Sequence, residues 1–149
     1  MICLSKIKQI TIGGFLTMFL SCSKLPHPMS EDLVGQWKSD MNEVLILYAN
    51  STFEAKGIVL SNYKAKLLFN DSSETKIGGK GTWKIYKTDN ENKLCLNYLS
   101  FVKKHETIEK QFGFTWSIKG SGLFENRLPW KIVSWIGDDE GISTFKKVK

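Results

Sequence analysis

Residues that could support acid–base, nucleophilic or metal chemistry are few in this chain and far apart. His27 lies between prolines, and His105 lacks the second histidine that a zinc-protease motif requires. The acidic run at residues 138–140 has oxygens that could attract a cation, but three acids between two glycines are typical of a solvated turn. Leucines flank Cys95, which predicts a buried, inert thiol. The sequence therefore predicts a non-enzymatic protein with no catalytic residue, no cofactor and no bound metal.

One cysteine, Cys22, stands at the end of a segment typical of exported proteins. Lys6 and Lys8 supply a positive start, and residues 10–20 supply an apolar middle. This is the three-part pattern of a cleaved secretory signal. The apolar stretch is shorter than the roughly 20 residues that a bilayer-spanning helix needs. We expect a signal peptide over residues 1–21 and a polar tether over residues 22–30.

The segment Phe19-Leu-Ser-Cys22 resembles the bacterial lipobox. That resemblance implies that Cys22 becomes the new N-terminus and carries the lipid, which makes a membrane the expected partner and the bacterial cell envelope the expected location. Ser23, instead of aspartate, resembles lipoproteins sent on to an outer membrane. Two alternatives stay open. Residues 21–23 also satisfy the small-x-small rule for ordinary cleavage, which would give a secreted or periplasmic protein beginning at Lys24, or the apolar segment is not cleaved.

Composition argues for one folded domain and against nucleic-acid binding. The chain is 42% hydrophobic and 12% aromatic, which excludes disorder for most of it. The formal net charge is +6, but among the 21 basic residues Arg127 is the single arginine. Recognition of phosphates and bases favours the guanidinium group. We expect the lysines to be spread over solvated strand faces, with no nucleic-acid partner.

Apolar and polar residues alternate from Gly35 onward, as they do in half-buried strands. Phe112, Phe114 and Trp116 show the pattern most clearly. A single helical turn is predicted over residues 30–33, with Ser30 as its N-cap. Turn-forming clusters, including residues 77–80, separate the strands. Because repeated strands with one apolar face need closed edges, an antiparallel barrel or a two-sheet sandwich follows. The nine predicted strands cover residues 35–39, 44–48, 52–59, 63–70, 83–87, 94–101, 112–119, 130–136 and 142–148.

The helical turn followed by Gly35 and Trp37 resembles the first strand of lipocalin-like barrels. A second Gly-Thr-Trp-Lys at residues 81–84 and the closing strand resemble later strands of bacterial lipocalin-like lipoproteins. The resemblance implies an all-β, antiparallel meander barrel of about eight strands over residues 31–149. It also implies that Gly35 allows close approach of the chain and that Trp37 plugs the closed end. In many lipocalins, an arginine near the end of the chain stacks over the tryptophan of the first strand. In this chain the last strand has Lys146 and Lys147 instead, which could make a weaker cation–π contact.

Two functions are compatible with such a barrel. An eight-stranded barrel is just wide enough to fill with side chains or to hold one small molecule. In the first hypothesis, the anchored barrel binds a small apolar ligand lined by Phe112, Phe114 and Trp116. In the alternative, the core is filled and the domain is an interaction module for an envelope protein, using an outward patch that includes Ile58, Leu60 and Leu68.

Overall fold

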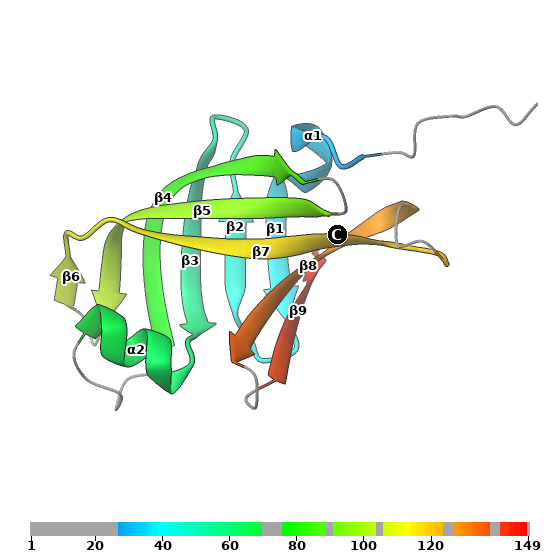
Figure 1. Cartoon of the computed structure of the whole chain (residues 1–149). Helices are drawn as coiled ribbons and strands as arrows, with labels where there is room; N and C mark the ends of the chain where they lie inside the picture. Colours follow the sequence, from blue (N-terminus) through cyan, green and yellow to red (C-terminus); the bar gives the residue numbers. More distant parts are fainter. Residues whose placement is uncertain are drawn as a thin grey trace, which may run out of the picture.

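Nine strands and two short helices form the part of the chain that the computed structural model describes, which is residues 27–69, 76–88, 91–103, 106–123, 127–137 and 141–148 (Figure 1). In chain order they are α1 (Ser30–Leu33), β1 (Gly35–Ser39), β2 (Val44–Leu47), β3 (Thr52–Val59), α2 (Asn62–Phe69), β4 (Lys76–Lys87), β5 (Asn92–Lys103), β6 (Glu106–Ile108), β7 (Phe112–Ser121), β8 (Arg127–Gly137) and β9 (Gly141–Lys147).

The strands form a closed antiparallel meander. β1 to β5, then β7, β8 and β9, each pair with the next strand along the chain, and β9 pairs back with β1. The short strand β6 pairs with the end of β5 beside β7. Closure leaves the eight barrel strands without a long exposed edge, which is the advantage of a barrel over an open sheet. The predicted fold class, an all-β meander barrel of about eight strands, is confirmed.

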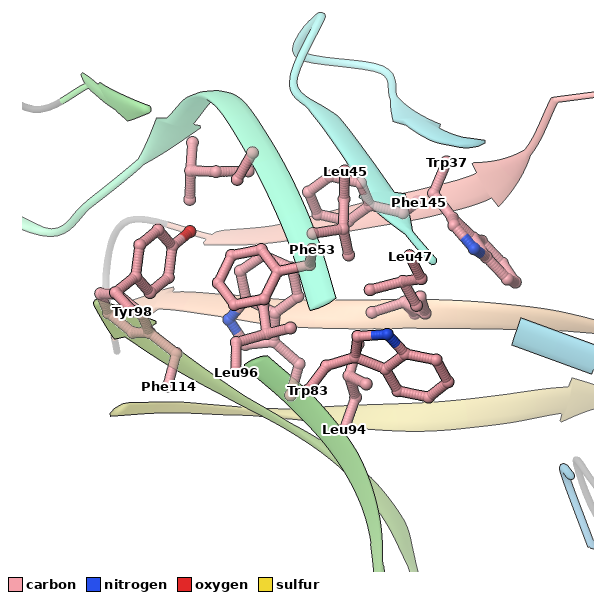
Figure 2. Close-up of a cluster of buried hydrophobic side chains, with 14 of the residues drawn as sticks. Trp37, Leu45, Leu47, Phe53, Trp83, Leu94, Leu96, Tyr98, Phe114 and Phe145 are labelled. Atoms are coloured by element: carbon pink, nitrogen blue, oxygen red, sulfur yellow. The ribbon is translucent and has the colours of Figure 1, made fainter. Parts of the chain in front are cut away.

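The period-two pattern explains how the barrel is filled. In β7, Phe114, Trp116 and Ile118 are buried, and the residues between them are more exposed. Figure 2 shows how large side chains from different strands meet in the interior, where the ring centres of Phe53 of β3 and Tyr98 of β5 lie 4.8 Å apart. Many of these side chains are completely buried, and they belong to one hydrophobic cluster that fills much of the interior. The labelled members are Trp37, Leu45, Leu47, Phe53, Trp83, Leu94, Leu96, Tyr98, Phe114 and Phe145.

The predicted strand over residues 63–70 is wrong, because most of this segment is the helix α2. Its sequence fits the two-residue period of a strand, but it also fits the period of a helix. Ala65 and Leu68 are three residues apart and both are buried, as on one face of a helix. Lysine, alanine and leucine are also strong helix formers. Ser61 starts the helix, since its Oγ accepts a hydrogen bond from the Lys64 amide at 3.2 Å.

Helix α1 occupies the predicted residues, but Ser30 is its first helical residue and Met29 is its N-cap. The Asp32 carboxylate accepts a hydrogen bond from the Met29 amide at 2.8 Å, the half of a capping box in which the third helical residue bonds back to the N-cap amide.

The glycine-rich segment at residues 77–80, predicted as a turn, lies inside the long strand β4. A Cβ on Gly79 would stand 2.4 Å from the Ser100 carbonyl oxygen, and one on Gly81 would stand 1.9 Å from that of Asn97. A register shift separates Lys80 from Gly81 in the pairing with β5. These glycines therefore let β5 approach β4 at an irregular point of the barrel wall, where the barrel bends.

Candidate functional site

The two ends of the barrel are covered by different helices. Figure 1 places α1 at one end, beside the start of β1, and α2 at the opposite end, below β3 and β4. Each helix is joined to distant strands by lysine side chains, so each end can be described by its own contacts.

At the α1 end, Trp37 fills the interior and is only 1% exposed. Its indole N–H donates to the Leu33 carbonyl oxygen at 2.7 Å. The Lys147 ammonium lies 5.8 Å from the centre of the Trp37 ring and donates to the Asp32 carbonyl oxygen at 2.7 Å. Gly35 has φ of +130°, and a Cβ there would stand 3.0 Å from Lys147 Cε. Glycine thus makes room for the lysine that lies over the tryptophan.

The predicted ligand-lining residues of β7 point inward but belong to the packed core. Phe114 and Trp116 are buried and Phe112 is half-buried. The Trp116 ring stacks on Phe145 at 5.2 Å between ring centres, and Phe112 meets Phe114 at 4.9 Å. The structure brings the three residues onto one inner face, where their rings contact other side chains.

Tyr98, which the sequence alone does not single out, is an unusual residue of this interior; the Trp130 indole N–H is the other buried side-chain group without a hydrogen-bond partner among the described residues. It stacks on Phe101 at 4.7 Å and meets Phe53 edge-on at 4.8 Å (Figure 2). Its hydroxyl is fully buried and has no hydrogen-bond partner among the described residues. Burial, with a smaller contribution from the charge of Glu43, raises the pKa of the Tyr98 hydroxyl far above its usual range. The hydroxyl therefore keeps its proton and is available as a donor.

Glu43 is a buried acid that ties three strands together. Its carboxylate accepts hydrogen bonds from Ser39 Oγ at 2.6 Å, from the Val59 amide at 2.8 Å and from Ser143 Oγ. These donors come from β1, β3 and β9. Sequence reasoning missed Glu43 because an acid just after Asp40-Met-Asn42 looks like a solvated turn residue. Period two did place Tyr98 on the same face as Leu94 and Leu96, but it carries no information about hydrogen bonding.

Helix α2 lies across the end of the barrel opposite α1, the end nearer to Glu43. The Lys64 ammonium donates to the Trp135 carbonyl oxygen at 2.9 Å and lies 5.8 Å from the centre of the Phe114 ring. Lys110 donates to the Leu68 carbonyl oxygen at 3.1 Å, and Phe69 meets Phe101 at 6.1 Å between ring centres. The helix is thus fastened to β5, to β8 and to the segment before β7.

The outer wall carries two hollows, of about 580 Å³ and 440 Å³. The larger has a floor that includes Gly78 and Gly79, and Lys56, Val102 and Glu109 are among the side chains around it. The smaller one lies next to it, between Tyr48 and Leu99. Both lie outside the barrel interior, against β3, β4 and β5.

The outward patch predicted from Ile58, Leu60 and Leu68 is not present, since all three side chains are buried. The register shift between Ala55 and Ile58 reverses the alternation in β3, which turns Ile58 inward. Leu60 directly follows β3 and Leu68 lies on α2, and both belong to the hydrophobic core cluster.

Cys95 was predicted to be buried and is instead half-exposed, with Sγ 3.8 Å from Thr115 Oγ1. Because neighbours along a strand point to opposite faces, the burial of Leu94 and Leu96 places Cys95 outside. His27 Nε2 lies 2.9 Å from Lys87 Nζ. His105, the acids at residues 138–140 and Cys22 lie outside the described residues.

Within the described ranges, no three His, Cys, Asp or Glu side chains come together in a group that could hold a metal ion. The same ranges contain no helix that is long and apolar enough to cross a membrane.

Comparison of the chain with protein-family models, curated proteins and solved structures found no match.

Proposed function

We propose that this chain is a non-enzymatic lipoprotein of a bacterial cell envelope, anchored through Cys22, whose barrel takes up one small, mostly apolar ligand with a hydrogen-bond acceptor. The anchor is supported by the order of Lys6 and Lys8, an apolar segment and Cys22. The uptake of a ligand is supported by the interior at the α2 end.

The observation that carries the ligand proposal is the buried Tyr98 hydroxyl without a partner. Buried polar groups are nearly always hydrogen-bonded, so an isolated one in an aromatic cluster calls for an explanation. A carbonyl or hydroxyl oxygen of a ligand would accept a hydrogen bond from this hydroxyl, and Phe53, Phe101 and Phe114 would surround the apolar remainder.

The route to this region would pass under α2. The helix has only eight residues, which is too short to be stable without its contacts. Two lysine–carbonyl hydrogen bonds, those of Lys64 and Lys110, help to hold it against the rest of the barrel. Displacement of α2 would open the end of the barrel near Tyr98 without separating any pair of barrel strands.

A specific observation favours the alternative, an interaction module for another envelope protein. Many core side chains among the described residues are completely buried, and two hollows lie on the outer wall over β3, β4 and β5. Binding of a partner, lost on replacing Leu99 and Val102 with lysine, together with absence of any bound small molecule, would support this alternative.

The anchor is tested by Cys22→Ser. We expect that the wild-type protein incorporates a fatty acid analogue during growth and sediments with membranes, and that the variant is not labelled and either stays unprocessed or is released. Cys95→Ser is the matched control, because it removes a half-exposed thiol of the folded domain. Equal labelling of the Cys22 variant and the wild type would rule out this anchor.

The ligand site is tested by Tyr98→Phe, which removes one oxygen. We expect an environment-sensitive apolar dye with a carbonyl group to bind the wild type at about one equivalent and to quench tryptophan fluorescence. The variant should bind it about 5–10-fold more weakly, the value of one hydrogen bond. Trp116→Leu should also weaken binding without unfolding the domain.

The stability of the Tyr98→Phe variant provides an independent test of the same hydroxyl. The ligand-free Tyr98→Phe protein should be more stable by about 1 kcal/mol, because the variant no longer buries a polar group without a partner. Since folding raises the Tyr98 pKa, the wild type should lose stability as pH rises above about 10, and the variant should lack this part of the loss. Tyr86→Phe, at an exposed position, is the control. No saturable dye binding to the folded wild type would favour the interaction module.

A further inference from the structure

The hairpin between β7 and β8 extends beyond the rest of the barrel at one end. β7 is paired with the start of β5 as far as Ile118, where it faces Asn92, and then continues to Ser121. Three further residues of strand correspond to about 10 Å. The pairing of Ser121 with Arg127 shows that β8 accompanies β7 over this extension.

This protruding hairpin presents apolar side chains to solvent. Leu123 is 91% exposed and Leu128 is 66% exposed, the two largest values among leucines that the structure describes. Scattered apolar residues are ordinary on a protein surface, but two highly exposed leucines close together on a projecting hairpin are placed to contact another apolar surface. Arg127, next to Leu128, is also exposed.

The tether leaves the barrel at the same end. α1, the hairpin between β4 and β5 and the hairpin between β7 and β8 lie at this end in Figure 1. The contact between His27 and Lys87 joins the tether to the β4 end, where Tyr86 is exposed as well. Tyrosine and arginine are suited to the boundary between lipid and water, because each combines an apolar body or stem with a polar tip.

The length of the tether then limits the distance to a membrane. Cys22 precedes His27 by five residues, which reach at most about 18 Å when fully extended. If Cys22 carries the lipid, as proposed above, the α1 end is held within this distance of the bilayer. The protruding hairpin covers a large part of such a gap. Arg127 and Lys87 would face an anionic lipid surface with complementary charge.

We propose that the β7–β8 hairpin is a second membrane contact, with Leu123 and Leu128 inserted at the lipid–water boundary beside the lipid anchor. The barrel then stands on its α1 end, and α2 faces the aqueous side. This inference rests on the proposed anchor at Cys22, and it adds an orientation that attachment through the lipid alone would not impose.

The test uses the full lipidated chain with Cys95→Ser, reconstituted in vesicles of phosphatidylethanolamine and phosphatidylglycerol. A nitroxide label is placed at Leu123→Cys or at Leu128→Cys, and the control label at Leu67→Cys, on an exposed leucine of α2. We expect collisions with a water-soluble nickel chelate to be about fivefold rarer at the hairpin than at α2, and collisions with oxygen to be more frequent, because oxygen concentrates in lipid.

A second variant separates insertion from simple proximity. With the label at residue 123, Leu128→Ser should raise the nickel accessibility severalfold while the protein stays on the vesicles. Unchanged circular dichroism and melting temperature would show that the domain is folded. Equal accessibility at residues 123 and 67 in vesicle-bound protein would overturn the hairpin contact alone. Failure of the protein to remain on vesicles would overturn the anchor and, with it, this contact.

Discussion

Replacing Trp37 with alanine is expected to lower the free energy of unfolding by about 4 kcal/mol, in the range for a buried tryptophan. The ring is buried, and its indole N–H holds the end of α1 through the Leu33 carbonyl. The truncation also removes the surface on which the Lys147 side chain lies. Since a domain of this size is stable by only about 5–15 kcal/mol, urea denaturation should show a large shift of the midpoint.

Two other tryptophans provide a graded control. Trp135 is 55% exposed, so Trp135→Ala should cost less than about 1 kcal/mol. The sequence alone suggests that Trp130, just after a proline at a strand start, tolerates truncation far better than Trp37. The structure buries Trp130 too, so we expect a smaller difference, with Trp37 still the more costly because the Trp130 indole N–H has no partner. Equal losses for Trp37 and Trp135 would contradict the plug at the α1 end.

The barrel could be predicted because its main determinant is the alternation of apolar and polar residues along each strand, which is visible in the sequence. Alternation in β7 already separates Phe114 and Trp116 from the solvent side, and a strand has a single inner face. The alternation gave a wrong prediction where a sequence fits both the two-residue period of a strand and the period of a helix, as it does around Ala65 and Leu68 of α2. It also failed at register shifts, which reverse the inner face at Ile58 without any change in composition. Local residue types do not determine such shifts, because the shifts depend on the partner strand.

Gly79 and Gly81 show a related limit. Glycine pairs are typical of turns, and nothing nearby in the sequence indicates that β5 will approach the backbone of β4 so closely. The tertiary contact, and not the local preference, decides their place in a long strand. The same reasoning explains why the electrostatic effect of Glu43 on Tyr98 could not be predicted. The two residues are brought near each other by strands that meet only when the barrel closes.

Replacing Glu43 with alanine is expected to lower the free energy of unfolding by about 3–5 kcal/mol. The change leaves Ser39 Oγ, the Val59 amide and Ser143 Oγ without their acceptor, and each buried donor left unpaired costs about 1–3 kcal/mol. The three donors belong to β1, β3 and β9, so the loss weakens the join between the first and last strands of the barrel. Urea denaturation followed by tryptophan fluorescence measures the effect.

Three further variants show whether the hydrogen bonds or the volume of the side chain are responsible. Glu43→Gln keeps one acceptor oxygen and nearly the same shape, so it should cost only about 1–2 kcal/mol. Glu54→Ala removes an exposed acid of β3 and should change stability by less than about 0.5 kcal/mol. In a double-mutant cycle, Ser143→Ala combined with Glu43→Ala should cost clearly less than the sum of the two, because both remove the same bond. Strict additivity, or a loss for Glu43→Ala no larger than that for Glu54→Ala, would show that this carboxylate does not hold the barrel closed.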